Sequence, residues 1–195
     1  MPAHTLETRR TVLADPLVQP LLRELEYEYS TRYPAVARTE GARSELERYP
    51  AEEFEPARGG LLLLLLEQGV PVAGGAYRRY DARTAELKRI WTAAAHRRRG
   101  LARRVVAELE REAAAAGYTR VYLTTGPRQP EARGLYLSTG YTPLFDLDAD
   151  PETVGPLPFA KHLLPARPPL TAADFRPLPR VDFGPRPDAP AAGDN

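Results

Sequence analysis

The chain has 195 residues, 43% of them hydrophobic and 27% charged, which favours one globular domain and is too short for two domains of ordinary size. Its net charge of +1 gives no overall positive field for nucleic acid, and the absence of cysteine excludes disulfides, thiolate metal ligands and cysteine nucleophiles. The longest apolar run, Leu61 to Leu66, is far shorter than the roughly 20 residues of a membrane-spanning helix, and the N-terminal residues lack the pattern of a secretion signal. We therefore expect a cytoplasmic protein that has neither nucleic acid nor a membrane as its partner.

The first part of the chain predicts one strand and two helices. Residues 8–13 are a candidate strand, and a helix is expected to begin near Pro20, because proline is well tolerated in the first turn. Residues 42–49 predict a second, short helix that ends before Pro50. The expected buried face of the first helix consists of Leu21, Leu22, Leu25 and Tyr29.

Six consecutive leucines, Leu61 to Leu66, lie between two glycine-containing turns. The run is too short for an ordinary helix, so we expect a strand buried on both faces. The turn at residues 67–69 then returns the chain into residues 70–80, which predicts an antiparallel hairpin.

The segment from Ala85 to Ala116 organises the rest of the chain. Residues 87–92 are rich in apolar, aromatic and β-branched side chains and predict a strand, whereas apolar residues recur every four positions after Gly100 and predict an amphipathic helix. Three arginines, residues 97–99, join the two elements. A helix N-terminus carries partial positive charge and disfavours each such cation by about 0.3 to 1 kcal/mol. We therefore expect a phosphate or pyrophosphate to bind at this join.

The remaining elements complete a sheet and leave a tail. Residues 118–125 predict a strand parallel to the organising strand, because a helix connects the two. A short helix is expected over residues 130–139, and the last strand candidates are residues 141–144 and 157–164. Residues 165–195 are rich in proline and show no period, which predicts a flexible C-terminal tail beside a folded domain of residues 1–164. The apolar side chains through which this tail could instead dock are Phe175, Leu178, Val181 and Phe183.

Two motifs give the chain a resemblance to a known family. The sequence Arg97-x-x-Gly100-x-Ala102, between a strand and a helix, resembles the acetyl-coenzyme A site of the GNAT superfamily of N-acetyltransferases. The second motif, Gln129-x-x-Ala132-x-x-Leu135-Tyr136, resembles a family segment that begins with asparagine, so Gln129 departs from the pattern by one methylene. The resemblance implies an α/β fold with a mixed, mostly antiparallel sheet, a central parallel strand-helix-strand unit and flanking helices.

The resemblance also implies how acetyl-coenzyme A would bind as co-substrate. Backbone N–H groups and arginines at the start of the central helix would hold the pyrophosphate, and the exposed backbone of the organising strand would pair with the pantetheine arm, provided that the neighbouring strand splays away. A backbone N–H near Trp91 would then polarise the thioester carbonyl. The residues assigned to the coenzyme are Ile90, Trp91, Thr92, Arg97, Arg98, Arg99, Gly100, Leu101, Ala102, Arg103 and Gln129.

Two side chains are candidates for proton transfer. Tyr136 falls where the family places its general acid, although a core aromatic residue is the structural alternative. Glu86, at the start of the organising strand, is a candidate base that would act on the acceptor amine through a water molecule. The alternative for Glu86 is an exposed residue that forms an ion pair with Lys88 or Arg89. Weaker candidates for binding a cationic acceptor are Glu24, Glu28, Tyr80 and Asp81.

These observations favour transfer of an acetyl group from acetyl-coenzyme A to a primary amine by direct attack. The acceptor is expected to be a small molecule or a peptide, and the protein a monomer or homodimer that uses no metal, since the three histidines lack metal-ligand spacing. One alternative is a non-catalytic sensor that binds an acyl-coenzyme A through the same loop. A second alternative is a nucleic-acid binder that uses Arg97 to Arg104, but no aromatic residues are interleaved with these arginines.

Overall fold

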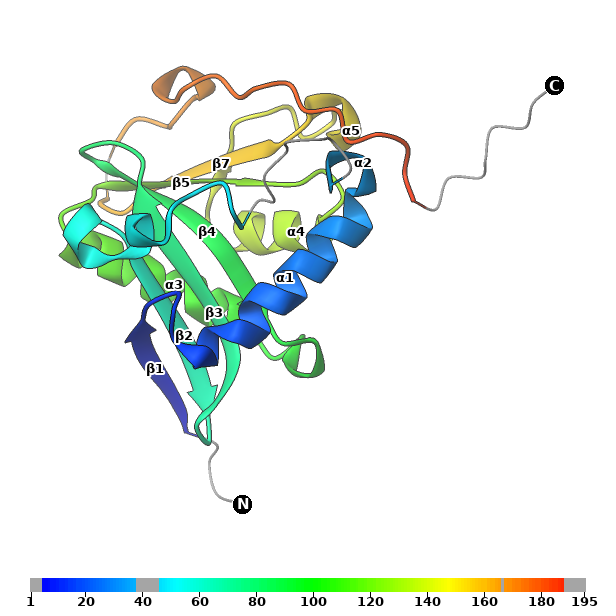
Figure 1. The fold of residues 1–195 in the computed structure, drawn as a ribbon. Coiled ribbons are helices and arrows are strands. Elements are labelled where there is room, and N and C mark those ends of the chain that lie inside the picture. The colour runs from blue at the N-terminus through cyan, green and yellow to red at the C-terminus, as the bar shows by residue number, and fades with distance from the viewer. Residues whose placement is uncertain (1–4, 38–45, 166, 188–195) are drawn as a thin grey trace.

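A computed structural model describes residues 5–37, 46–165 and 167–187 of the chain. The described residues form one seven-stranded sheet with the strand order β1-β2-β3-β4-β5-β7-β6 and helices on both faces (Figure 1). The strands are β1 (Leu6–Thr11), β2 (Leu61–Glu67), β3 (Val70–Arg79), β4 (Thr84–Thr92), β5 (Arg120–Thr125), β6 (Thr142–Pro143) and β7 (Leu157–His162). The α-helices are α1 (Gln19–Arg32), α2 (Pro34–Ala37), α3 (Leu101–Ala115), α4 (Pro130–Ser138) and α5 (Pro151–Val154).

The observed elements confirm the predicted fold class. The sheet is antiparallel except for the pair β4 and β5, which α3 connects. The first strand begins two residues earlier than expected, and α1 begins at Gln19, one residue before Pro20. The predicted helix over residues 42–49 lies largely outside the described residues, and residues 46–49 are turns and bends. None of the helices that the structure describes combines the length and apolarity needed to cross a bilayer.

The six leucines of β2 explain why the sheet is covered on both faces. All six are buried, and their side chains alternate between two separate clusters. Leu61, Leu63 and Leu65 pack with α3, whereas Leu62, Leu64 and Leu66 pack with α1. The prediction of a strand buried on both faces is therefore confirmed.

The central strands β4 and β5 separate along their length, and this places the site. Their parallel pairing consists of Thr84–Arg120, Ala85–Val121 and Glu86–Tyr122, after which the two strands diverge (Figure 1). Opposite β3, the register of β4 shifts between Lys88 and Trp91. Arg89 lies at this bulge with a φ of 59°, a conformation that is costly for a residue with a Cβ. The bulge and the separation leave one edge of β4 open beyond Glu86.

Gly75, opposite the bulge, lets α3 lie close to the sheet. A Cβ at this position would lie 2.7 Å from Ile90 Cδ1 and 2.9 Å from Val105 Cγ1, distances that a packed core cannot accommodate without movement. We expect Gly75→Ala to lower the free energy of unfolding by about 1 to 3 kcal/mol, measured by urea denaturation. The matched control is Gly134→Ala in α4, where a Cβ would meet open space. The control variant should be as stable as the parent or slightly more stable, and equal stability of the two variants would contradict the packing argument.

The segment predicted as a flexible tail runs across β5 and β7 and reaches α2 (orange to red in Figure 1). Within it, Leu170 and Phe175 are buried and pack with Tyr122 and Ala160. Residues 167–187 therefore form part of the surface around the site described below.

Candidate active site

The start of α3 has the geometry of an anion site. Gly100 is exposed, has a φ of 76°, and a Cβ on it would meet nothing within 4 Å. The first bond of the helix runs from Arg104 N to Gly100 O at 3.1 Å, so the N–H groups of Leu101, Ala102 and Arg103 have no acceptor within the helix. Several backbone donors and the positive helix end thus lie in an open, solvent-facing position.

Two of the arginines before α3 are paired with carboxylates of the protein. Arg97 Nη2 lies 3.3 Å from Glu28 Oε2, and Arg99 Nη2 lies 2.6 Å from Glu67 Oε1. Arg98 is exposed and has a φ of 61°. The sequence predicts a negatively charged group near these cations. Glu28 and Glu67 supply part of that negative charge, and no sequence pattern indicated these two residues. In both pairs the guanidinium is about half-exposed and reachable from solvent, whereas the carboxylate is largely buried.

The residues predicted to bind the pantetheine arm lie on the open part of β4. Ile90, Trp91 and Thr92 follow the last residue that pairs with β5. The Trp91 ring is buried on the α1 side of the sheet, where its Nε1 donates a hydrogen bond to Glu24 Oε2 at 3.1 Å. The same oxygen accepts a hydrogen bond from Ala94 N, so Glu24 fixes the end of the strand.

Tyr136 reaches the gap between the two separated strands. It lines a small cavity of about 70 Å³ together with residues 87–90 of β4 and residues 124–125 of β5. Its ring packs against Tyr141 and Phe159 at centroid distances of 5.5 and 5.6 Å. No hydrogen bond joins its hydroxyl to another residue within the described part of the chain. Burial raises the pKa of the Tyr136 hydroxyl well above its ordinary value of 10.0.

Gln129 is held by protein groups at the start of α4. Its Oε1 accepts hydrogen bonds from Gly126 N at 3.0 Å and Thr125 Oγ1 at 3.1 Å. Its Nε2 donates to Glu28 Oε1 at 3.0 Å. Gln129 therefore links α4 to α1 and, through Glu28, to Arg97. Its contact with a coenzyme stays a prediction.

Arg103 points from α3 towards the end of α4. Its guanidinium donates to the Ser138 carbonyl and to Ser138 Oγ, both at 3.0 Å. These bonds connect α3, whose N-terminus is open, to α4, which carries Tyr136. The role of Arg103 towards a pyrophosphate also stays a prediction.

Glu86 is buried and forms two ion pairs. Its Oε2 lies 2.7 Å from Arg78 Nη2, and its Oε1 lies 3.2 Å from Lys88 Nζ. The alternative of an exposed ion pair is thus half right: Lys88 is a partner, but the carboxylate is buried and its second partner is Arg78 rather than Arg89. Arg89 instead donates to Leu46 O and lies over the Phe54 ring. A buried carboxylate between two cations is not free to accept a proton unless one cation moves.

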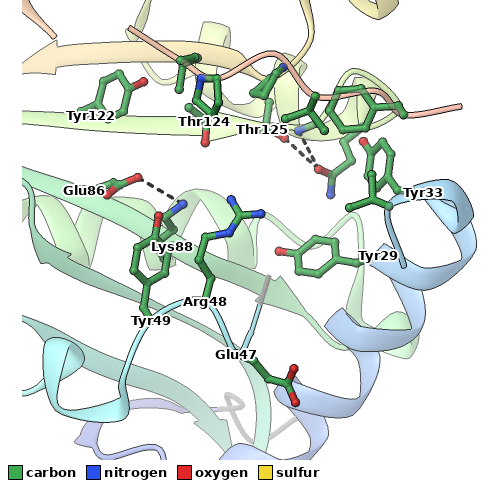
Figure 2. A pocket seen from close by; sticks show the side chains of 18 of the residues that line it. Tyr29, Tyr33, Glu47, Arg48, Tyr49, Glu86, Lys88, Tyr122, Thr124 and Thr125 are labelled. Carbon is green, nitrogen blue, oxygen red and sulfur yellow. Dashed lines mark hydrogen bonds and ion pairs between the residues drawn. The ribbon is translucent and has the colours of Figure 1, made fainter. Parts of the chain in front are cut away.

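A larger pocket of about 650 Å³ lies on the α1 side of β4 and β5. Figure 2 shows Tyr122, Thr124 and Thr125 of β5 facing Glu86 and Lys88 of β4 across this space. The large and small cavities meet, because both are lined by Tyr29, Tyr49, Lys88, Thr124, Thr125 and Gln129. A group bound in the large pocket can therefore reach the gap that contains Tyr136.

Sequence reasoning missed most of the residues that line this pocket. Tyr49 lies under Arg78 and Lys88, whose charged groups are 4.0 and 5.0 Å from its ring centroid. No motif marks these positions, because they come from elements far apart in the sequence. The weaker acceptor candidates, where described, are held in structural contacts: Glu24 with Trp91, Glu28 with Arg97, Asp81 with Arg120, and Tyr80 with Arg176.

The described residues contain no group of three or more histidine, aspartate or glutamate side chains placed to hold a metal ion.

An open strand edge, an exposed helix N-terminus and a buried tyrosine beside the strand edge fit an acyltransferase that uses a thioester of coenzyme A. Residues 22–141 match the model of the acetyltransferase (GNAT) family. The chain belongs to this family, and the identification made from its two motifs is confirmed. The same family match confirms the predicted enzyme class, acyltransferase.

Individual relatives agree with this assignment. The uncharacterized N-acetyltransferase YsnE of Bacillus subtilis is 38% identical over 93 residues, which are 45% of this chain and 62% of the relative. The chain thus spans about three-fifths of the length of this curated relative. An acetyltransferase structure from Streptococcus agalactiae has a TM-score of 0.61 at 19% identity and covers 80% of this chain and 98% of its own. The PaiA N-acetyltransferase of Thermoplasma acidophilum, solved in complex with coenzyme A, has a TM-score of 0.60 at 16% identity and covers 81% and 99%. These two likenesses establish the fold.

Proposed function

We propose that this protein transfers an acetyl group from acetyl-coenzyme A to a primary amine of a small molecule or peptide, by direct attack of the amine. One observation carries the proposal: Tyr136 occupies the gap between β4 and β5, and that gap opens into the larger pocket. Family membership and the coenzyme A complex of the Thermoplasma relative support the choice of acyl donor.

The residues present fit a coenzyme. The open N-terminus of α3 with Gly100 suits a diphosphate, and Arg97, Arg98 and Arg99 would add positive charge. The free edge of β4 at residues 90–92 suits an extended, amide-containing arm. When bound, the coenzyme supplies the acyl group as a reactive thioester.

Tyr136 would act as the general acid in this reaction. A phenol of ordinary pKa about 10 is protonated at neutral pH, and burial raises the pKa of the Tyr136 hydroxyl further. A coenzyme thiol resembles cysteine with a pKa of about 8.5, so proton transfer from a phenol of pKa about 10 costs roughly 2 kcal/mol, and a higher phenol pKa increases this cost. A thiolate is poorly solvated in apolar surroundings, so Tyr136 would donate its proton to the sulfur as the bond between the carbonyl carbon and the sulfur breaks.

Glu86 would act as the general base for the amine through a water molecule, which requires Lys88 to turn away from the carboxylate. A lysine-like amine loses its proton at neutral pH at a cost of about 4 to 5 kcal/mol, which a base or desolvation has to offset in part. The Glu86 carboxylate faces the pocket in Figure 2, and the apolar walls described below desolvate an amine that enters.

The decisive experiment measures release of free thiol from acetyl-coenzyme A in the presence of a panel of primary amines. Because the chain has no cysteine, all thiol detected comes from the coenzyme. We expect release that depends on an amine, with formation of the acetylated amine confirmed by mass spectrometry. The panel contains simple alkylamines, arylalkylamines, amino acids, polyamines and a lysine-containing peptide. Binding of coenzyme A without turnover of any amine would instead support the non-catalytic sensor.

We also infer a cytoplasmic location and a monomeric or homodimeric state. The lack of cysteine supports the first inference, since it suits a reducing compartment. Size-exclusion chromatography with light scattering tests the second inference directly.

A further inference from the structure

The segment after β7 forms one side of the large pocket and is fixed at its first end. We call residues 170–184 the C-terminal strap. Phe175 stacks on Tyr122 of β5 with a centroid distance of 4.6 Å and an interplanar angle of 23°. Leu170 is buried beside them, and the Arg120 guanidinium lies 5.0 Å from the Phe175 ring centroid. These contacts bury apolar area and hold the strap against the sheet.

The strap is fixed again at its second end. Arg128 Nη2 donates a hydrogen bond to the Gly184 carbonyl at 2.5 Å, and the Arg128 side chain is only 8% exposed. The same guanidinium pairs with Glu152 at 2.8 Å and donates to the Arg32 carbonyl at the end of α1 at 2.8 Å. Phe183 packs against Tyr33, which follows α1, with a centroid distance of 5.0 Å. Arg128 therefore joins the strap, α5 and the end of α1 in one contact.

Between these anchors the strap lines the pocket. The residues that line it are Arg176, Pro177, Leu178, Pro179, Val181 and Phe183. Arg176 N donates to Tyr80 Oη at 2.6 Å, so the span begins in a fixed position. The two prolines restrict the backbone of the span, because each ring fixes φ. A short, stiff chain held at both ends acts as a wall.

The surfaces that face the pocket are mostly apolar or aromatic. The rings of Tyr29, Tyr33, Tyr49 and Tyr122 also line the pocket, and two of them, Tyr33 and Tyr122, pack directly against strap residues. Three of the charged lining residues are matched, because Glu86 pairs with both Arg78 and Lys88. The other charged residues on α1 and before β2 that line the pocket are the exposed Glu26, Glu47 and Arg48. The walls therefore favour a ligand with an apolar or aromatic body more than one with several charges.

We propose that the C-terminal strap is the outer wall of the acceptor site, and that the acceptor is a small primary amine with an apolar or aromatic body. This proposal rests on the proposed acetyl transfer. A volume of about 650 Å³ accommodates such an amine beside the junction with the smaller cavity. The strap lies outside residues 22–141, which match the family model, so it is a feature of this chain that the family assignment does not supply.

The first test compares acetylation of phenethylamine and ethylamine. The variant is Leu178→Ala combined with Val181→Ala, and the control is Arg180→Ala, an exposed residue of the strap that does not line the pocket. Loss of apolar contact should lower kcat/KM for phenethylamine at least about tenfold, with a much smaller effect on ethylamine and no change in KM for acetyl-coenzyme A. The control should retain the parent ratio. An unchanged ratio in the double variant, or a parent enzyme that prefers spermidine or a lysine peptide to phenethylamine, would overturn the proposal.

A second test does not depend on catalysis. Thr124→Cys places a single thiol in the pocket of a chain that has no other cysteine. We expect methyl methanethiosulfonate to react readily and N-pyrenylmaleimide to react slowly. The Leu178→Ala, Val181→Ala pair should speed the bulky reagent several-fold and leave the small reagent unchanged. Equal effects on both reagents, or none, would show that the strap is not a wall. In another outcome, the double variant speeds labelling by the bulky reagent while no amine is acetylated. That result would support the strap as a wall of the pocket and would reject both the proposed acceptor class and the proposed function.

Discussion

Replacement of Tyr136 by phenylalanine is expected to lower kcat for acetyl transfer by roughly 10²- to 10⁴-fold, the usual contribution of a general acid. The hydroxyl is the one group lost, and the ring keeps its contacts with Tyr141 and Phe159. Affinity for coenzyme A should therefore stay within about twofold of the parent, since the diphosphate and the arm are proposed to bind at the start of α3 and along β4. Steady-state kinetics and calorimetric titration of coenzyme A measure the two quantities separately.

The control for this variant is Tyr141→Phe, which removes a neighbouring buried hydroxyl and should leave turnover nearly intact.

A raised pKa means that folded Tyr136 holds its proton more tightly than the unfolded chain does, so this residue favours folding less as the pH rises above about 10. Ionisation of Tyr136 should thus produce no loss of rate near neutral pH. A Tyr136→Phe enzyme with parental kcat would return Tyr136 to the role of a core aromatic residue.

The variant Glu86→Gln is expected to reduce the free energy of unfolding by about 3 kcal/mol and to reduce turnover. Removal of one partner from a buried ion pair leaves the other charge poorly compensated, which usually costs about 3 to 5 kcal/mol. The lower value is expected here because Arg78 keeps Glu53 as a second partner, 2.8 Å away. Guanidinium denaturation measures the stability, and thiol release measures the rate.

A double variant separates the structural role of Glu86 from the chemical one. Addition of Lys88→Met to Glu86→Gln removes both members of one ion pair, so part of the lost stability should return. The turnover should not return, because the carboxylate is still absent. If the double variant regains turnover together with stability, Glu86 acts only as a structural residue.

The sequence predicted the parts of this fold in which local pattern and burial agree. The leucine run could only be a strand between two turns, and it lies between α1 and α3 as that reading requires. The arginines and Gly100 pointed to the helix start, because unfavourable charge placement is visible in the sequence itself. The separation of β4 and β5 was a condition for the coenzyme to pair with β4, and the pairing of the two strands stops at Glu86.

Other features depend on contacts between distant residues and could not be predicted. Arg89 adopts a positive φ that sequence patterns associate with glycine, because tertiary packing over Phe54 and the bulge outweighs local preference. Glu28 is separated by about a hundred positions from Gln129, so no local pattern reveals their hydrogen bond. The pocket walls come from α1, the segment before β2, β5 and the C-terminal strap, and composition alone marked the strap as a tail.

The chain contains a single tryptophan, Trp91, on the open edge of β4. Its indole is buried and donates a hydrogen bond to Glu24 on α1, so all tryptophan emission comes from one defined place on β4. The protein thus carries its own optical reporter: ligands that settle along β4 change the surroundings of one fluorophore, and occupancy can be followed in the unmodified chain without any label.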